Sequence, residues 1–286
     1  MDLEFRKLSP DLGAEVLGAD LAHPLDDRSF GAIHGTFLSH GILLFREQHA
    51  MGPAEQTAFS RRLGRLAETI PNERMHDHYP ILVLSNIVRD GKPVGSGRGG
   101  QFWHSDLFYN AIPAAASFLH ALVVPEEDGR SLGDTKFANM AAAHDALPEA
   151  MKKKLEGLKN RVSRVKSWPI NYPFRPPLTD EEKAAYGSVV HPLVRTHPET
   201  GRKSLYIGDI SAGTVVGMPA GEGDALLSEL RDFATQPRFT YVHRWSVGDA
   251  ILWDNRSTLH AATDFDAEEH ERLMHRTTIM DDTVPT

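Results

Sequence analysis

His104 and Asp106 are separated by a single residue, in the short motif Trp-His-Ser-Asp. In an extended strand, residues i and i+2 point to the same face, so this imidazole and this carboxylate would lie side by side. Such a pair makes up two thirds of a 2-His-1-carboxylate triad, the ligand set typical of non-haem Fe(II) oxygenases. The interpretation then depends on a second histidine, on groups that hold a co-substrate, and on a fold that brings them together.

The best candidate for the second histidine is His260. It follows Trp253–Arg256, near the end of an expected strand, and its small neighbours Ala261 and Ala262 would leave room for a ligand. Taken alone, His260 would more simply cap a loop. The assignment of His260 as a metal ligand therefore depends on the segment that follows it.

Arg272 and Arg276 lie four residues apart near the C-terminus and would share one face of a strand with Met274 between them. Two arginines inside a barrel need anionic partners, because burying an unpaired charge is costly. A guanidinium binds a carboxylate through two parallel hydrogen bonds. The pattern predicts two anionic ligands, one for each arginine. The alternative is a pair of surface arginines that face the acidic run Glu268–Glu271.

Four other motifs carry less information. The turn Gly133–Thr135 leads into a strand, and the Thr135 hydroxyl could donate to a carboxylate. The stretch Gly95–Gly100 matches G-x-G-x-x-G, but it follows a turn and leads into extended residues, so it does not predict a dinucleotide site. A loop flanking the site and a plain surface loop both remain open. We expect His76–His78 to be solvated surface, and His197 to lie in a Pro/Gly turn without a role in the site.

Composition restricts the function classes. The chain has 286 residues, a formal net charge of −8 and no cysteine. Disulfides, thiolate metal sites, Fe–S clusters and cysteine nucleophiles are therefore excluded. The acidic balance disfavours nucleic acid and anionic membranes as partners, and no apolar stretch is long enough to span a bilayer. The N-terminus lacks a signal pattern, so we expect a cytoplasmic protein, and the sequence leaves open whether it is a monomer or a homo-oligomer.

The hydrophobic pattern predicts one α+β, mainly β, domain over residues 1–286. Many short strands with turn signals and few crossovers favour a double-stranded β-helix, a jelly-roll barrel of the cupin type with surrounding helices. Residues 168–177 should be irregular, because they are rich in proline and aromatic residues. We expect helices over residues 26–41, 53–63, 139–158 with a break near Pro148, and 225–234. We expect strands over residues 42–45, 81–85, 118–124, 189–196, 204–207, 239–245, 250–254 and 273–280.

Taken together, these motifs resemble the taurine dioxygenase and 2,4-dichlorophenoxyacetate dioxygenase (TauD/TfdA) family of Fe(II)- and 2-oxoglutarate-dependent enzymes. The resemblance covers nearly the whole chain and includes Gly13–Leu21, Leu43–Gln48 and Trp253–Arg256 besides the motifs above. Pro192–His197 and Tyr241–Trp245 place it closer to the phenoxyacetate branch.

The resemblance implies a role for each candidate residue. His104, Asp106 and His260 would bind Fe(II) and form the catalytic centre. Thr135 and Arg272 would hold the distal carboxylate of 2-oxoglutarate. Oxidative decarboxylation by O2 would then yield succinate and CO2 while the substrate is hydroxylated. The acidic group of a small anionic organic substrate would bind Arg276, and Phe102 and Phe108 are candidates for its pocket, although ordinary core packing also explains both.

The favoured substrate is an aryloxyalkanoate, which is degraded in the breakdown of herbicides and aromatic acids and would be cleaved to a phenol and an oxo acid. The alternative within the same chemistry is an alkyl sulfonate, a sulfate ester or another small carboxylate, since a guanidinium suits all of these anions. Two readings from other classes are a zinc hydrolase that uses the same three ligands and a non-catalytic binding barrel. The sequence shows no separate base or nucleophile for the hydrolase. The intact ligand set and both arginines disfavour a non-catalytic binding barrel.

Overall fold

The structure, a computed structural model, describes residues 3–70, 73–97 and 99–286. Arg98 of the glycine-rich stretch and Met1 and Asp2 of the N-terminus lie outside these ranges. Within them, no helix has both the length and the apolar character needed to cross a membrane.

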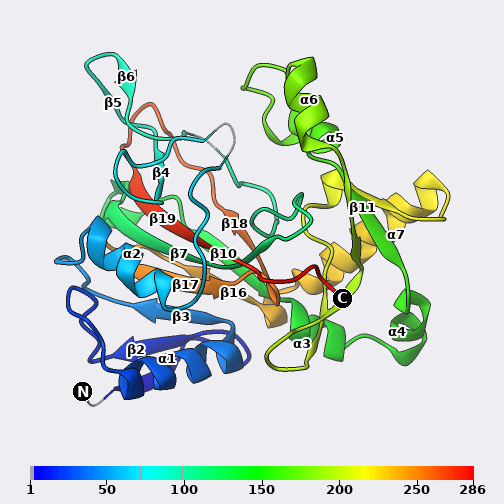
Figure 1. Ribbon diagram of the computed structural model, residues 1–286, viewed down its shortest axis with the longest axis horizontal. Coiled ribbons are helices and arrows are strands. Elements are labelled where there is room, and N and C mark those ends of the chain that lie inside the picture. Colours follow the sequence, from blue (N-terminus) through cyan, green and yellow to red (C-terminus); the bar gives the residue numbers. More distant parts are fainter. Residues whose placement is uncertain (1–2, 71–72, 98) are drawn as a thin grey trace.

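A seven-stranded sheet forms the larger half of the fold (Figure 1). Its strands pair antiparallel, except for the parallel pair β2 and β3. Both faces of the sheet are covered, which explains why its central strands read as continuous apolar runs rather than as alternating ones. In spatial order the strands are β1 (Glu4–Lys7), β2 (Ala14–Leu17), β3 (Ile42–Phe45), β17 (Ala250–Asp254), β7 (Ala114–Val123), β19 (Leu273–Met280) and β4 (Leu82–Ser85).

A three-stranded sheet faces the inner side of the large one, and the two enclose a core. This smaller sheet consists of β16 (Thr240–His243), β10 (Thr135–Asn139) and β18 (Thr258–Ala262). Phe137 of β10 packs in one cluster with Leu119 of β7, Trp253 of β17 and Met274 of β19. The predicted jelly-roll barrel, mainly β with helices around it, is confirmed.

Two N-terminal helices cover the outer face of the large sheet, as Figure 1 shows in blue. Helix α1 (Asp27–His40) begins at Asp26, whose side chain accepts from the Ser29 N–H, and ends at Gly41 with φ +71°. Helix α2 (Pro53–Arg61) is tied to the sheet by Gln56, whose amide donates to main-chain oxygens of β7 and β19. Both helices begin and end where the sequence predicts, apart from the last two residues of α2.

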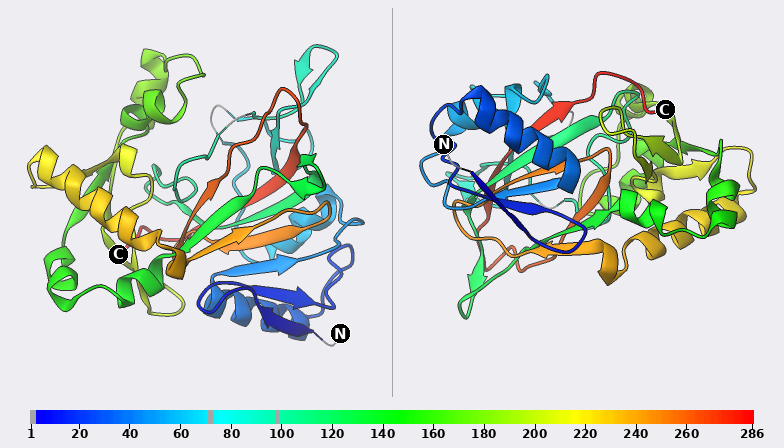
Figure 2. Two further views of the ribbon diagram at one scale, coloured as in Figure 1. Left: turned by 180° about the vertical axis from the view of Figure 1, so that it is seen from behind. Right: turned by 90° about the horizontal axis from the view of Figure 1, so that it is seen from below.

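A helical module is inserted between β10 and β16 and lies beside the barrel (Figures 1 and 2). Its own core joins Leu193 and Leu205 to Leu226 and Leu230. Its helices are α3 (Met140–Asp145), α4 (Glu149–Leu155), α5 (Arg164–Asn171), α6 (Asp180–Tyr186), α7 (Ala220–Ala234) and the 3₁₀ turns Ile210–Ala212 and Pro237–Phe239. Its strands are β11 (Lys159–Val162), β12 (Val189–Pro192), β13 (Val194–Thr196), β14 (Lys203–Leu205) and β15 (Gly213–Val215). Two hairpins elsewhere pair β5 (Val88–Arg89) with β6 (Lys92–Pro93) and β8 (Glu126–Glu127) with β9 (Arg130–Ser131).

The expectation of an irregular segment over residues 168–177 is wrong for its first four residues. Helix α5 starts at the cap Ser163, upstream of that segment, and tolerates Pro169. The indole N–H of Trp168 donates to the Pro176 carbonyl and folds the following chain back onto the helix. The N-cap at Ser163 therefore stabilises a helix that continues through Pro169, although proline usually disrupts helices.

Candidate active site

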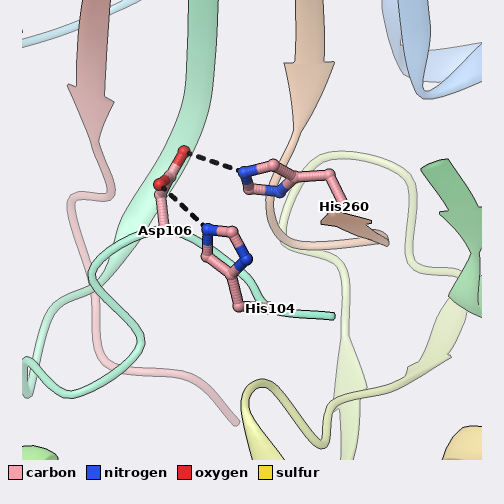
Figure 3. Close-up of side chains that lie close together, drawn as sticks. All are labelled: His104, Asp106 and His260. Carbon is pink, nitrogen blue, oxygen red and sulfur yellow. Dashed lines mark ion pairs between the residues drawn. The ribbon is translucent and has the colours of Figure 1, made fainter. Parts of the chain in front are cut away.

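His104, Asp106 and His260 come together at one end of the barrel, and their ligand atoms all lie within 4.8 Å of one another. The Asp106 carboxylate is 3.9 Å from His104 Nε2 and 3.7 Å from His260 Nε2. Figure 3 shows both rings turned toward this carboxylate. In the described part of the chain, no other group of three such side chains is arranged to hold a metal ion.

The pairing of two distant segments aligns the histidines. His104 and His260 exchange both main-chain hydrogen bonds, at 3.0 and 2.9 Å, and their rings are 4.1 Å apart. His260 lies within β18, so the loop-cap interpretation is wrong. The expectation of an extended strand at His104 is also wrong, because only this single bridge forms and the chain turns after Asp106. A Cβ on Gly100, where φ is +77°, would come within 3.2 Å of the His104 ring, so glycine suits this close approach.

The protonation states suit a divalent cation. His104 Nδ1 lies 2.8 Å from the Phe102 carbonyl, which can only accept, so Nδ1 carries a proton and Nε2 is the ring nitrogen that faces the site. Burial opposes the ionisation of Asp106, but Arg276, His260 and His104 outweigh it and lower the pKa of this carboxyl to about 2. Burial and the nearby His104 lower the pKa of His260 well below its usual value. The site therefore offers two imidazoles and one ionised carboxylate as ligands.

Two polar side chains that the sequence did not single out fix Asp106. The Ser117 hydroxyl donates to Asp106 Oδ2 at 2.6 Å, and the Asn255 amide donates to that hydroxyl at 3.0 Å. Asn255 Oδ1 in turn accepts the Asp106 N–H at 3.0 Å and the Trp253 indole N–H at 3.1 Å. The only signal in the sequence was the position of Asn255 next to the conspicuous Trp-Asp pair.

Replacement of Asn255 should weaken the metal site without removing a ligand. Asn255→Ala takes away the acceptor for the Asp106 N–H and the donor to Ser117, so the carboxylate loses its fixed orientation. Loss of such a supporting contact typically costs about 10- to 100-fold in metal affinity. Titration of the apo-protein with Mn(II) by calorimetry measures this loss. Unchanged affinity in a folded variant would show that the network does not orient Asp106.

A cavity extends from the triad and contains every site residue predicted from the sequence. Arg272 is half-buried, its buried Nε has no acceptor, and its side chain donates to no described residue. Burial alone lowers the pKa of Arg272 to about 10. Arg276 donates to Asp106 Oδ1 at 2.6 Å, while its buried Nε has no partner among the residues that the structure describes. Both arginines face inward, as the strand pattern predicts.

The remaining candidate residues from the sequence also line the cavity. Thr135, Phe102 and Phe108 line the cavity, as do Gly97, Gly99 and Gly100 of the glycine-rich loop. That loop therefore flanks the site. Phe102 is half-buried with its ring 5.0 Å from His104, whereas Phe108 is almost fully buried.

The two other histidine clusters lie outside the site. His76 is half-buried against His275, and its neighbours Asp77 and His78 are exposed. His197 is buried with its ring 2.9 Å from the Asp254 carboxylate, whereas the following residues of its turn are exposed, so this histidine supports the core and not the site.

Comparison with known proteins identifies the class of site. The family model described as "Taurine catabolism dioxygenase TauD, TfdA family" matches residues 4–278. The chain belongs to the TauD/TfdA family. The alpha-ketoglutarate-dependent 2,4-dichlorophenoxyacetate dioxygenase of Cupriavidus pinatubonensis is 37% identical over 98% of this chain and 99% of that protein. The alpha-ketoglutarate-dependent sulfate ester dioxygenase of Pseudomonas putida is 28% identical over 98% and 90%.

A solved structure agrees with this assignment. AAD-2 in complex with Mn(II) and N-oxalylglycine superposes with a TM-score of 0.83 at 32% identity, covering 100% of both chains. This TauD/TfdA member is thus an Fe(II)- and 2-oxoglutarate-dependent dioxygenase that uses O2. The donor set fits that cofactor, because two imidazoles and one ionised carboxylate converge beside a cavity whose Arg272 has no anionic partner among the described residues.

Proposed function

We propose that this enzyme hydroxylates a small organic acid, an aryloxyalkanoate, at the carbon next to the ether oxygen. The hemiacetal that results would collapse to a phenol and an oxo acid. When bound by His104, Asp106 and His260, iron would supply the oxidising chemistry, with 2-oxoglutarate and O2 as co-substrates. The observation that carries the proposal is a cavity with the triad, two inward-facing arginines and aromatic walls.

Arg272 and Thr135 are suited to the distal carboxylate of 2-oxoglutarate. Arg272 carries a desolvated guanidinium that has no acceptor in the described chain, so an anion would offset its desolvation penalty. The Thr135 hydroxyl accepts the Trp245 indole N–H at 3.0 Å. That bond uses a lone pair of the oxygen and leaves the Thr135 O–H proton free to donate.

Arg276 is suited to the acid group of the primary substrate. It lies on the inner face of β19, directly beside the metal ligand Asp106, and its Nε has no acceptor. Because the Asp106 charge would be shared with a bound metal ion, the guanidinium would remain available to a second anion. An acid held there would place the adjacent C–H bonds near the triad.

The aromatic side chains favour a planar substrate body. Phe102, Phe108, Tyr109 and Tyr172 line the cavity together with Trp253. Rings prefer offset or edge-to-face contacts with other rings, so these walls would accommodate a phenoxy group better than a short alkyl chain. This argument, with the higher identity to a phenoxy-acid enzyme, favours an aryloxyalkanoate over a sulfonate or sulfate ester.

One screen tests the proposal. Succinate formation would be measured with Fe(II), 2-oxoglutarate and O2 against phenoxyacetate, both 2-phenoxypropionate enantiomers, taurine and an alkyl sulfate. We expect the phenoxy acids to stimulate succinate release most strongly. Preference for taurine or the alkyl sulfate would overturn the choice of substrate. Oxygen-independent turnover with zinc would overturn the reaction itself, and the absence of any stimulated turnover would support a binding barrel.

Arg276→Ala should weaken binding of the primary substrate and spare the slow decay of 2-oxoglutarate that occurs without it. A buried hydrogen bond to a charged group is worth roughly 1.5–3 kcal/mol, so KM for the substrate should rise about 10- to 100-fold. Parallel assays of succinate with and without substrate separate the two effects, and Arg276→Lys serves as the control that keeps the charge. If Arg276→Ala instead abolishes binding of 2-oxoglutarate, the roles of the two arginines are exchanged.

A further inference from the structure

A third arginine of the cavity has no counterpart in the chemistry described so far. Arg164 is the first residue of α5, belongs to the helical module, and lines the cavity that contains the triad. Its residue exposure is only 6%. Its Nε is buried without an acceptor, and within the described ranges its side chain donates no hydrogen bond and forms no ion pair.

The local structure does not explain why a cation is placed there. Arg164 and Lys166 occupy the first turn of α5, where the helix dipole favours negative charge rather than positive charge. Tyr109, Tyr186 and Trp168 surround the guanidinium, with ring centroids 4.4, 4.8 and 5.2 Å from Cζ. These cation–π contacts offset part of the cost of burial, but they leave the N–H groups without acceptors.

Two further charged side chains of the helical module that line the cavity, Arg175 and Asp209, already have partners. Arg175 forms an ion pair with Glu73 at 3.0 Å. Asp209 accepts hydrogen bonds from Asn171 and Ser211 and forms no ion pair with Arg164 among the described residues. An unpaired guanidinium in this part of the cavity is thus a site for an anion that the chain does not supply.

A continuous aromatic wall connects Arg164 with the triad. The Phe102 ring lies 5.0 Å from the His104 ring and 6.0 Å from the Tyr172 ring. Arg164 Cζ in turn lies 6.0 Å from the Tyr172 ring. A phenoxy acid anchored at Arg276 and lying along Phe102 and Tyr172 would thus point its ring toward Arg164.

We propose that Arg164 binds an anionic oxygen substituent on the end of the primary substrate away from the iron, and so selects aryloxyalkanoates that carry a second acidic group on the ring. This inference rests on the proposed function for the orientation of the substrate. Arg164 would contribute to specificity and affinity, and its positive charge would not take part in the oxidation.

The test compares two ligands of similar shape, 4-carboxyphenoxyacetate and 4-methylphenoxyacetate. Their Kd values would be measured by calorimetry on protein loaded with Mn(II) and 2-oxoglutarate, so that binding is independent of turnover. The native protein should prefer the carboxy ligand by at least about tenfold. Arg164→Met should abolish the preference by weakening the carboxy ligand alone, and Arg164→Lys should restore part of it.

A matched control removes the effect of overall charge. Arg161→Met changes the same charge at an exposed position three residues earlier in the chain and should leave the preference unchanged. If Arg164 has a purely structural role, Arg164→Met should weaken the binding of both ligands equally, and this result would overturn the proposal. Equal Kd values of the two ligands for the native protein would also overturn it. Arg164-dependent binding without succinate release would support the inference and contradict the proposed function. Turnover of phenoxyacetate by a protein that does not prefer the carboxy ligand would support the proposed function and contradict the inference about Arg164.

Discussion

His104→Ala is expected to abolish both Fe(II) binding and turnover. His104 supplies one of three ligand atoms gathered within 4.8 Å, and the described residues bring no fourth candidate of this kind to them. Loss of a mere supporting contact already costs about 10- to 100-fold in metal affinity, so loss of a ligand should cost more. Calorimetric titration with Mn(II) and succinate assays with Fe(II) measure the two effects.

The control for this variant is His78→Ala, which removes an exposed histidine outside the site and should change neither quantity. Folding should survive His104→Ala, because the two hydrogen bonds between residues 104 and 260 belong to the main chain. A thermal melt of the apo-proteins checks this point. Retained metal affinity and turnover in a folded variant would show that the metal lies elsewhere.

The sequence predicted the ligand types better than the local structure that holds them. The short spacing of His104 and Asp106 and the shared face of Arg272 and Arg276 predicted, together with His260, that these residues line one site, and the structure places them around one cavity. The strand expected at His104 is instead a single bridge to His260. Such a bridge joins segments more than 150 residues apart, so no local pattern could reveal it. The surrounding barrel follows from apolar runs, which report burial and not pairing partners.

The polar contacts that support Asp106 were likewise not predictable from local sequence patterns. Ser117 lies in the mainly apolar strand β7 and Asn255 in a turn, and neither residue has a spacing that predicts contact with Asp106. Arg164 was invisible for a related reason, since its place in the cavity depends on how the module docks beside the barrel. Residues that meet through tertiary packing alone are therefore those that the structure adds.

Arg272→Met is expected to abolish binding of 2-oxoglutarate while leaving the metal site intact. The variant removes a guanidinium that has no acceptor in the described chain and is suited to a carboxylate. Two charge-assisted hydrogen bonds at roughly 1.5–3 kcal/mol each correspond to a loss of at least about 100-fold in affinity. Calorimetry of 2-oxoglutarate on the Mn(II)-loaded protein measures this loss, and Mn(II) affinity should stay the same.

Although Arg272→Met should lose affinity for 2-oxoglutarate, its thermal stability without ligand should not fall. Burial alone lowers the pKa of Arg272, which means that the charged form is held at a cost in the free protein. Methionine of similar length removes that cost, so the free variant should melt at the same temperature as the native protein or higher. Added 2-oxoglutarate should raise the melting temperature of the native protein only, because a ligand stabilises the state that binds it. A variant that still gains stability from 2-oxoglutarate would show that another cation holds the distal carboxylate.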